Sequence, residues 1–286
     1  MRKMKIVADS SADVLSLDGV EYAFAPLKIL TSEKEYVDDA DLDVETMVKD
    51  FDVYKGKSSS SCPNTGDWLE VFGDADDIFC VTITSGLSGS YNSACAAKQV
   101  YESENPGRRV FVLDTLSAGP EIRLIVEKLG EYVRAGLPYE EICSKIEEYR
   151  KHTGLIFMLK SLKNFANNGR VSPTVAKIVG FLGICIVGKA SDEGTLEPMH
   201  KCRGEKNSLE RMVSDLEKLG YNGGKICVTH CQNEDVVQQM QSLIRKKFGD
   251  VPIMVAHQRG LCSFYAEKGG ILLGFEKKTS IERCDR

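Results

Sequence analysis

Three apolar segments in the first half of the chain each end in a cluster of small polar residues. They are Lys5–Ala8, Ile78–Ile83 and Arg109–Leu113, followed by Asp9-Ser10-Ser11, Thr84–Ser90 and Asp114–Gly119. Helical spacing of apolar positions lies between or after them, over Leu42–Phe51, Thr65–Phe72, Tyr91–Glu102, Pro120–Ala135 and Pro138–His152. Short strands that alternate with amphipathic helices indicate βαβ units. We therefore predict a parallel sheet covered by helices on both faces, a three-layer α/β/α domain.

The pattern changes near residues 150–155. Two extended runs within Ile184–Arg203 flank Asp192-Glu193-Gly194 and predict an antiparallel hairpin. Short helices are expected after a strand over Gly154–Leu159, and the remaining elements are strands over Lys225–His230, Pro252–His257 and Ile271–Glu276 and helices over Ser208–Leu219 and Glu234–Phe248. The overall class is thus α/β, with residues 1–152 as the parallel-sheet domain. Residues 153–286 are predicted as a two-layer α+β domain with a mixed sheet.

The charge balance argues against a nucleic-acid partner. The 286 residues carry a net charge of −5, from 42 acidic and 37 basic residues, and the longest basic run is Arg245–Lys247. The longest apolar stretch, Ile178–Gly188, is far shorter than the ~20 residues that a membrane span needs. Residues 1–5 lead into a strand pattern without the apolar region of a signal peptide. We therefore expect a soluble cytoplasmic protein without a membrane span.

The ten cysteines are scattered singly, and no C-x-x-C occurs. Cys227 and Cys231 form the closest pair, on and just after a predicted strand. Free cysteine packs as a small apolar residue, so we interpret the ten as reduced packing thiols rather than a zinc site. The sequence also lacks the histidine spacings typical of metal sites, a P-loop and the dinucleotide-binding G-x-G-x-x-G. Neither a metal nor a cofactor is expected.

Hydroxyl groups dominate the predicted strand ends, where parallel α/β sheets bind ligands. Ser88-Gly89-Ser90 opens a helix, and its hydroxyls and backbone amides suit a carboxylate or phosphate. The alternative is that Ser88 or Ser90 only caps the helix. Likewise, the serine run Ser58–Ser61 is either part of a site or a flexible loop. Arg170, just after Gly169, is either a guanidinium fork for an anion or a surface arginine.

A second possibility for Ser88 is nucleophilic catalysis. Gly86-Leu87-Ser88-Gly89-Ser90 differs from the hydrolase motif G-x-S-x-G only at its last residue. Such an enzyme needs a histidine base, and none of the four histidines, His152, His200, His230 and His257, lies in a recognisable triad context. A serine hydrolase of acyl esters therefore remains the alternative function.

Several short motifs occur in an order that resembles the DegV family of bacterial fatty-acid-binding proteins, from the first strand to the last. Ser60-Ser61-Cys62-Pro63 stands where the family has T-S-Q-P, and Thr84–Tyr91 where it has S-S-G-L-S-G-T-Y. The other matching segments are Val7–Ser11, Ala25-Pro26-Leu27, Val112–Thr115, Leu162-Lys163-Asn164, Gly169–Ser172 and Gly269–Phe275. Each motif is weak alone, but the ordered set is specific.

The resemblance implies a non-catalytic protein that holds one long-chain fatty acid at the interface of its two domains. It implies that Ser60 and Ser88 donate to the carboxylate, with Ser61 and Ser90 beside them, and that Arg170 is available to an acyl phosphate. The acyl tail would lie in an apolar tunnel. The implied partners are the fatty acid and a dihydroxyacetone-kinase-like fatty acid kinase, and a binder of another apolar anion without a kinase is the further alternative.

The chain departs from the family pattern in three places. Ser60 and Cys62 replace the usual threonine and glutamine, which keeps a hydroxyl at position 60. In the family's H-x-G-x-G motif, Tyr265 takes the place of the histidine and Glu267 that of the first glycine. Pro120 follows the third strand end. Because that histidine is expected near the phosphorylated head group, Tyr265 is the departure that bears on kinase coupling, and it is a further candidate ligand-binding residue.

Overall fold

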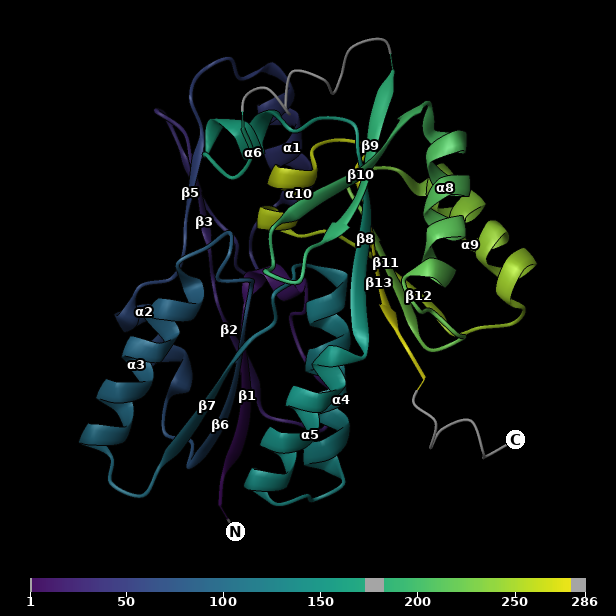
Figure 1. Cartoon of the computed structure of the whole chain (residues 1–286). Helices are drawn as coiled ribbons and strands as arrows, with labels where there is room; N and C mark the ends of the chain where they lie inside the picture. The colour runs from purple at the N-terminus through teal and green to yellow at the C-terminus, as the bar shows by residue number, and fades with distance from the viewer. Residues whose placement is uncertain (1, 173–182, 279–286) are drawn as a thin grey trace.

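The first sheet is built from four parallel strands. In the computed structural model, which describes residues 2–172 and 183–278, they run in the order β2-β1-β6-β7 (Figure 1). Their bounds are Met4–Asp9 for β1, Tyr22–Ala25 for β2, Asp77–Thr82 for β6 and Arg109–Asp114 for β7. All six residues of β6 are buried, as expected for a central strand covered on both faces. The predicted parallel sheet is confirmed, and β2 was missed.

Helices cover both faces of this sheet. Trp68 and Phe72 of α2 (Thr65–Phe72) and Ala94 and Tyr101 of α3 (Ser90–Glu104) pack on one face. On the other face lie α4 (Pro120–Arg134) and α5 (Tyr139–Lys151), which contribute, among others, Ile125 and Ile146 to a second core. The predicted three-layer α/β/α arrangement is therefore confirmed.

The second sheet is mixed and has six strands in the order β10-β9-β8-β13-β11-β12. The strands are β8 (Thr153–Leu159), β9 (Ile184–Ala190), β10 (Leu196–Arg203), β11 (Ile226–His230), β12 (Ile253–His257) and β13 (Ile271–Glu276). Only β11 and β12 pair in parallel, and β9 and β10 form the predicted hairpin. Helices α8 (Glu205–Lys218) and α9 (Glu234–Phe248) cover one face, while α4 lies against the other. The molecule is thus layered, with α4 between the two sheets (Figure 1).

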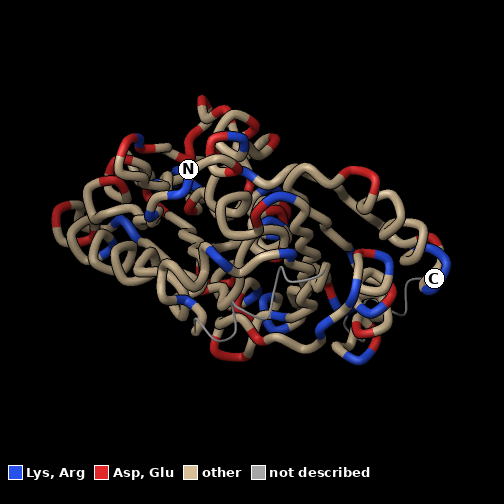
Figure 2. The backbone as a smooth tube through the Cα atoms, turned by 90° about the horizontal axis from the view of Figure 1, so that it is seen from above, with Lys and Arg blue, Asp and Glu red and all other residues tan. Residues whose placement is uncertain are grey.

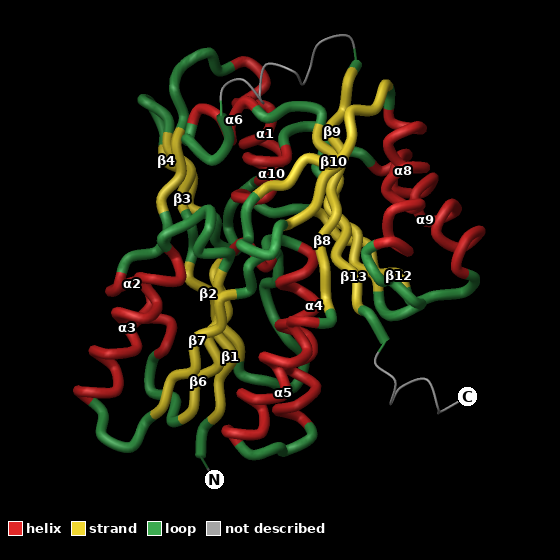
Figure 3. The backbone as a smooth tube through the Cα atoms, in the orientation of Figure 1, coloured by secondary structure: helices red, strands yellow, loops and turns green. Residues whose placement is uncertain are grey.

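A third, small sheet was not predicted. Its antiparallel strands β4 (Glu35–Val37), β3 (Lys28–Leu30) and β5 (Ser59–Ser61) lie next to α1 (Val44–Val53), α6 (Lys163–Asn167) and α10 (Gly260–Ala266) (Figure 3). A 3-10 turn, η1 (Ser10–Ala12), follows β1. The serine run is therefore a strand rather than a flexible loop, and its register pairs Ser60 with Ile29.

The division into domains at residues 152 and 153 stays a prediction. Strand β8 begins at Thr153, yet α10 from the second half packs against η1, β3 and α1 from the first. Residues 178–182 of the apolar stretch lie outside the described residues. No helix in the described part of the chain has the length and apolar composition of a membrane span. Basic and acidic residues are interspersed along the backbone (Figure 2).

Candidate functional site

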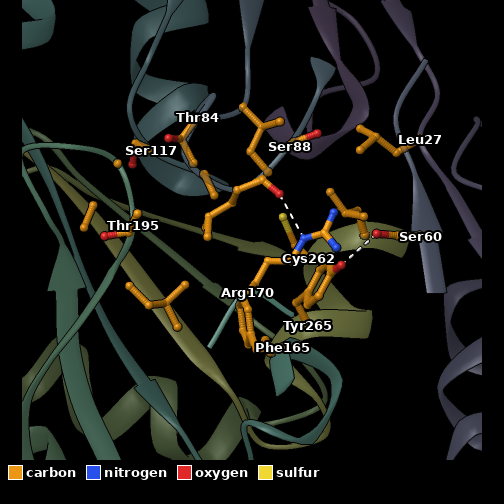
Figure 4. A pocket seen from close by; sticks show the side chains of 18 of the residues that line it. Leu27, Ser60, Thr84, Ser88, Ser117, Phe165, Arg170, Thr195, Cys262 and Tyr265 are labelled. Carbon is orange, nitrogen blue, oxygen red and sulfur yellow. Dashed lines mark hydrogen bonds between the residues drawn. The ribbon is translucent and has the colours of Figure 1, made fainter. Parts of the chain in front are cut away.

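A cavity of about 280 Å³ lies between the strand ends of the first sheet and the face of the second sheet. Ser60, Ser61, Ser88, Arg170 and Tyr265 all line it. Apolar side chains form most of the remaining wall, among them Leu27, Ile83, Leu155, Phe157, Leu159, Phe165, Leu196, Leu261 and Leu272. The structure thus brings together five of the six predicted site residues, from β5, the β6–α3 loop, the segment after α6, and α10 (Figure 4).

Ser88 lies in the loop between β6 and α3. Its hydroxyl oxygen accepts a hydrogen bond from the backbone N–H of Ser90 at 3.3 Å. The N-cap residue of α3 is Gly89, which provides no side-chain cap. Because Ser88 also lines the cavity, its hydroxyl proton can be donated to a ligand while the oxygen accepts from the backbone.

Ser90 does not line the cavity. It is fully buried, and its hydroxyl donates to Asp9 Oδ2 at 2.6 Å. The same oxygen accepts from the N–H of Ile83 at 2.8 Å, and the other carboxylate oxygen accepts from the Ser11 hydroxyl. Burial raises the pKa of Asp9, and these donors oppose the shift. Ser90 therefore anchors the loop that carries Ser88, instead of taking the ligand-facing place expected from the resemblance.

Ser60 and Tyr265 meet although 205 positions separate them. Their hydroxyl oxygens are 2.7 Å apart, and the Tyr265 ring packs on Phe165 with a centroid distance of 4.7 Å (Figure 4). The N–H of Ser60 donates to Asn168 Oδ1 at 3.3 Å. Burial raises the pKa of Tyr265, while the bond to Ser60 and the charge of Arg170 oppose the shift. Tyr265 is therefore a neutral phenol that can donate a proton.

Arg170 connects two parts of the cavity wall. Its Nε donates to the carbonyl of Leu87 at 3.0 Å, beside Ser88 (Figure 4). Its Nη1 donates to the carbonyl of Asn168. The side chain is only partly buried. Arg170 is thus held at the cavity wall by two backbone carbonyls, and its role as an anion-binding group stays a prediction. No Asp or Glu is among the described residues that line the cavity.

Comparison with known proteins assigns the family. The model of the family described as "uncharacterised protein, DegV family" matches residues 3–278. A DegV domain-containing protein of Streptococcus pneumoniae is 42% identical over 276 residues, covering 95% of this chain and 98% of the relative. The chain belongs to the DegV family.

Two solved DegV structures are similar over nearly the whole chain. A DegV family protein from Eubacterium eligens, loaded with heptadecanoic acid, is 44% identical with a TM-score of 0.93, covering 96% of this chain and 100% of that one. The Streptococcus pneumoniae fatty acid kinase B3 protein, loaded with linoleic acid, is 41% identical with a TM-score of 0.94 and the same coverage. The DegV resemblance and the fold expected from it are therefore confirmed.

None of the four histidines of this DegV protein lines the cavity. His152 lies 3.1 Å from Glu148 and His200 lies 2.7 Å from Asp215, measured between the side-chain N and O atoms. His230 and His257 line a different groove. Ser88 therefore has no imidazole base in the cavity, and the geometry does not favour the hydrolase alternative.

The sequence interpretation missed several wall residues. Phe165 stacks on Tyr265, and Cys262 projects from α10, a helix that was not predicted. Asn168 positions the backbone of Ser60. The signal that could have revealed Asn168 is its place directly before the family motif that begins with Gly169-Arg170. The nine cysteines of the described residues are free thiols, and burial raises the pKa of Cys62 and Cys262 on the cavity wall.

Proposed function

We propose that this DegV protein binds one long-chain fatty acid and carries it without chemical conversion. The observation that carries the proposal is the uneven polarity of the cavity, with hydroxyls and a guanidinium gathered in one region and apolar walls elsewhere. Burial contributes about 0.8 kcal/mol for each CH₂, so the hydrocarbon chain supplies most of the affinity. The two solved relatives loaded with heptadecanoic and linoleic acid support this choice of ligand.

The polar region satisfies the head group. A buried carboxylate is costly unless it accepts hydrogen bonds, and Ser60, Ser88 and Tyr265 offer hydroxyl donors on the cavity wall. Arg170 adds a positive charge nearby, and Ser61 lies next to Ser60. Ser90 contributes indirectly, because it fixes the Ser88 loop through Asp9. The hydroxyls therefore orient the ligand, while the apolar wall binds it.

The partner in this proposal is a fatty acid kinase that receives the bound acid. The similarity to the protein named as the fatty acid kinase B3 protein supports it. We propose a dihydroxyacetone-kinase-like partner, a cytoplasmic location and no cofactor, as expected from the sequence. Tyr265 replaces the expected histidine with a neutral phenol, which can donate a hydrogen bond to an acyl phosphate but brings no positive charge of its own.

The test is denaturing solvent extraction of the purified protein followed by mass spectrometry of the lipids. Wild type is compared with Ser88→Ala and with Ser103→Ala, an exposed serine on α3 whose hydroxyl donates only to the carbonyl of Val100. We expect a stoichiometric fatty acid in wild type and Ser103→Ala, and less in Ser88→Ala. A wild-type protein that carries no lipid after purification and does not bind added oleate or palmitate would refute the proposal. Turnover of p-nitrophenyl esters that disappears in Ser88→Ala would instead support the hydrolase.

A further inference from the structure

Helix α10 lies between the lipid cavity and a second groove of the molecule. Leu261, Cys262 and Tyr265 line the lipid cavity described above. Ser263 and the preceding Arg259 line a second groove, of about 930 Å³. The helix has only seven residues, and a helix of this length is not stable in water without tertiary contacts. The position of this wall of the cavity must therefore be fixed from outside the helix.

Two carboxylates from the first forty residues fix its start. Asp13 Oδ1 accepts a hydrogen bond from the N–H of Arg259 at 2.8 Å. Asp38 Oδ1 and Oδ2 accept from the next two N–H groups, those of Gly260 and Leu261, at 2.8 and 2.9 Å. The N-cap residue Arg259 makes no side-chain cap of its own. Asp38 and Asp13 thus replace a local cap, because their oxygens accept from N–H groups that have no partner within the helix.

The contact is tightly built. Asp38 is fully buried and Asp13 is 5% exposed, so hydrogen bonds from these backbone N–H groups replace the hydrogen bonds that both carboxyl groups make with water in the unfolded chain. Gly260 allows the approach, because a Cβ atom there would lie 2.7 Å from Asp38 Oδ1 and 2.6 Å from Leu42 Cδ2. Any larger residue would push the carboxylate and the helix apart.

We propose that Asp38, assisted by Asp13, is a positioning residue for the lipid cavity. It holds α10 at the register in which the Tyr265 hydroxyl meets Ser60 Oγ. Asp38 directly follows β4, while Ser60 lies in β5 of the same three-stranded sheet. One small sheet therefore sets both members of the Ser60–Tyr265 hydrogen bond, Ser60 directly and Tyr265 through α10. This inference rests on the proposed function.

The test replaces Asp38 with asparagine. The Asp38→Asn side chain has one acceptor oxygen and turns an NH₂ group toward a backbone N–H, so the start of α10 loses at least one hydrogen bond. We expect about tenfold faster hydrogen exchange in peptides covering residues 259–266, and an about tenfold higher Kd for the fluorescent fatty acid cis-parinaric acid.

The matched control is Asp77→Asn. Asp77 is also fully buried and accepts from Arg2 and Arg109 at 2.7–2.9 Å, but at the amino end of β6, away from the cavity. It should lower the thermal midpoint while changing the Kd and the exchange of residues 259–266 by less than about twofold. Equal Kd values, or equal exchange rates in residues 259–266, for Asp38→Asn and Asp77→Asn would overturn the proposal.

If Asp38→Asn does not fold, Asp13→Asn is the second test, because it leaves both hydrogen bonds of Asp38 to α10 in place. Asp13→Asn keeps an acceptor for the N–H of Arg259 and should raise the Kd about threefold, with faster exchange at the start of α10. Unchanged values for it would then overturn the proposal. A wild-type protein that binds no fatty acid would refute the proposed function, whereas the exchange comparison would still report whether the carboxylates anchor α10.

Discussion

Asp13 is a buried carboxyl with one bonded oxygen. Oδ1 accepts from Arg259, whereas Oδ2 is buried without a hydrogen-bond partner among the described residues. Burial raises the pKa of Asp13 from 3.8 to about 7, the neighbouring Asp38 adds to the shift, and the N–H of Arg259 and the charge of Arg123 oppose it. Near neutral pH the folded protein therefore holds a proton at this site that the unfolded chain has lost.

This proton makes stability depend on pH. Between pH 3.8 and about 7 the folded state binds more protons than the unfolded state, so the free energy of unfolding falls as pH rises, by up to about 1.4 kcal/mol per pH unit. The contribution is complete below pH 3.8 and is lost as pH rises through about 7. Asp13→Asn removes it. In urea unfolding, the free energy of unfolding of wild type minus that of Asp13→Asn should therefore be larger at pH 5 than at pH 8. A difference that does not change with pH would contradict this assignment.

The Tyr265 hydroxyl offers a second prediction at this scale. Tyr265→Phe keeps the ring on Phe165 but removes the hydrogen bond to Ser60, a loss of about 1 kcal/mol of stability. We expect an about fivefold higher Kd for cis-parinaric acid, because a donor near the head group disappears. Tyr101→Phe is the control, since its hydroxyl donates to the carbonyl of Ala75 at 2.6 Å outside the cavity. The prediction fails if both variants bind the fatty acid equally well.

Individual elements were predictable where the signals are local. Helix α2 begins at Thr65 as predicted, because Asn64 and Asp67 form a capping box: Asn64 Oδ1 accepts from the N–H groups of Gly66 and Asp67, and the N–H of Asn64 donates to Asp67 Oδ2 at 2.8 Å. The chain contains this signal within four residues. Such a helix can be located without knowing the rest of the fold.

The contribution of that capping box to the free energy of unfolding can be measured. Asn64→Ala should lower the free energy of unfolding by about 1 kcal/mol, followed through the fluorescence of Trp68, the only tryptophan, which is fully buried in α2. Fatty-acid binding should stay unchanged. The control is Asn207→Ala in α8, whose exposed amide makes a single bond to the carbonyl of Arg203, so no loss is expected there. Equal destabilisation by both variants would show that the cap is not what stabilises α2.

The elements that were missed have no local signal. Each strand of the small sheet has three residues, too few for an alternating pattern, and β5 is made of serines that pair with β3 about thirty positions earlier. Helix α10 is buried on nearly every side, and its cap is Asp38, 222 positions away. These elements depend on long-range contacts, which a single sequence does not display.

At the scale of the whole molecule, α4 joins the two sheets. A Cβ atom at Gly274 of β13 would lie 2.6 Å from the backbone N of Glu121, so the helix and strand touch backbone to backbone. The buried Glu121 accepts from Thr153 Oγ1 at 2.6 Å at the start of β8. The four main site residues, Ser60, Ser88, Arg170 and Tyr265, converge only because these layers are fixed. The family motifs predicted their roles, but no pattern in the sequence predicted their distances.

The β9–β10 turn closes the cavity from the second sheet. Its residues bond to one another, with the N–H of Ser191 donating to the carbonyl of Thr195 at 2.9 Å and that of Gly194 to the carbonyl of Ser191 at 2.9 Å. The tip rests on the first half of the molecule, since a Cβ at Gly194 would lie 2.0 Å from Thr84 Oγ1. Thr84, Gly194 and Thr195 all line the cavity. Among the described residues, no hydrogen bond joins the turn to Thr84. The turn is therefore held against Thr84 by close packing.

Gly194→Ala should therefore open the cavity. The new methyl group pushes the turn away from Thr84, so cis-parinaric acid should dissociate at least about threefold faster in a stopped-flow experiment. The free energy of unfolding should fall by about 1–2 kcal/mol, because alanine is strained at the positive φ of +73°. Gly136→Ala also places a side chain at a positive φ, +70°, but a Cβ there meets nothing within 4 Å. It should lose similar stability while releasing the lipid at the wild-type rate. If the two variants release it equally fast, the strain rather than the turn controls release, and the ligand leaves through another part of the wall.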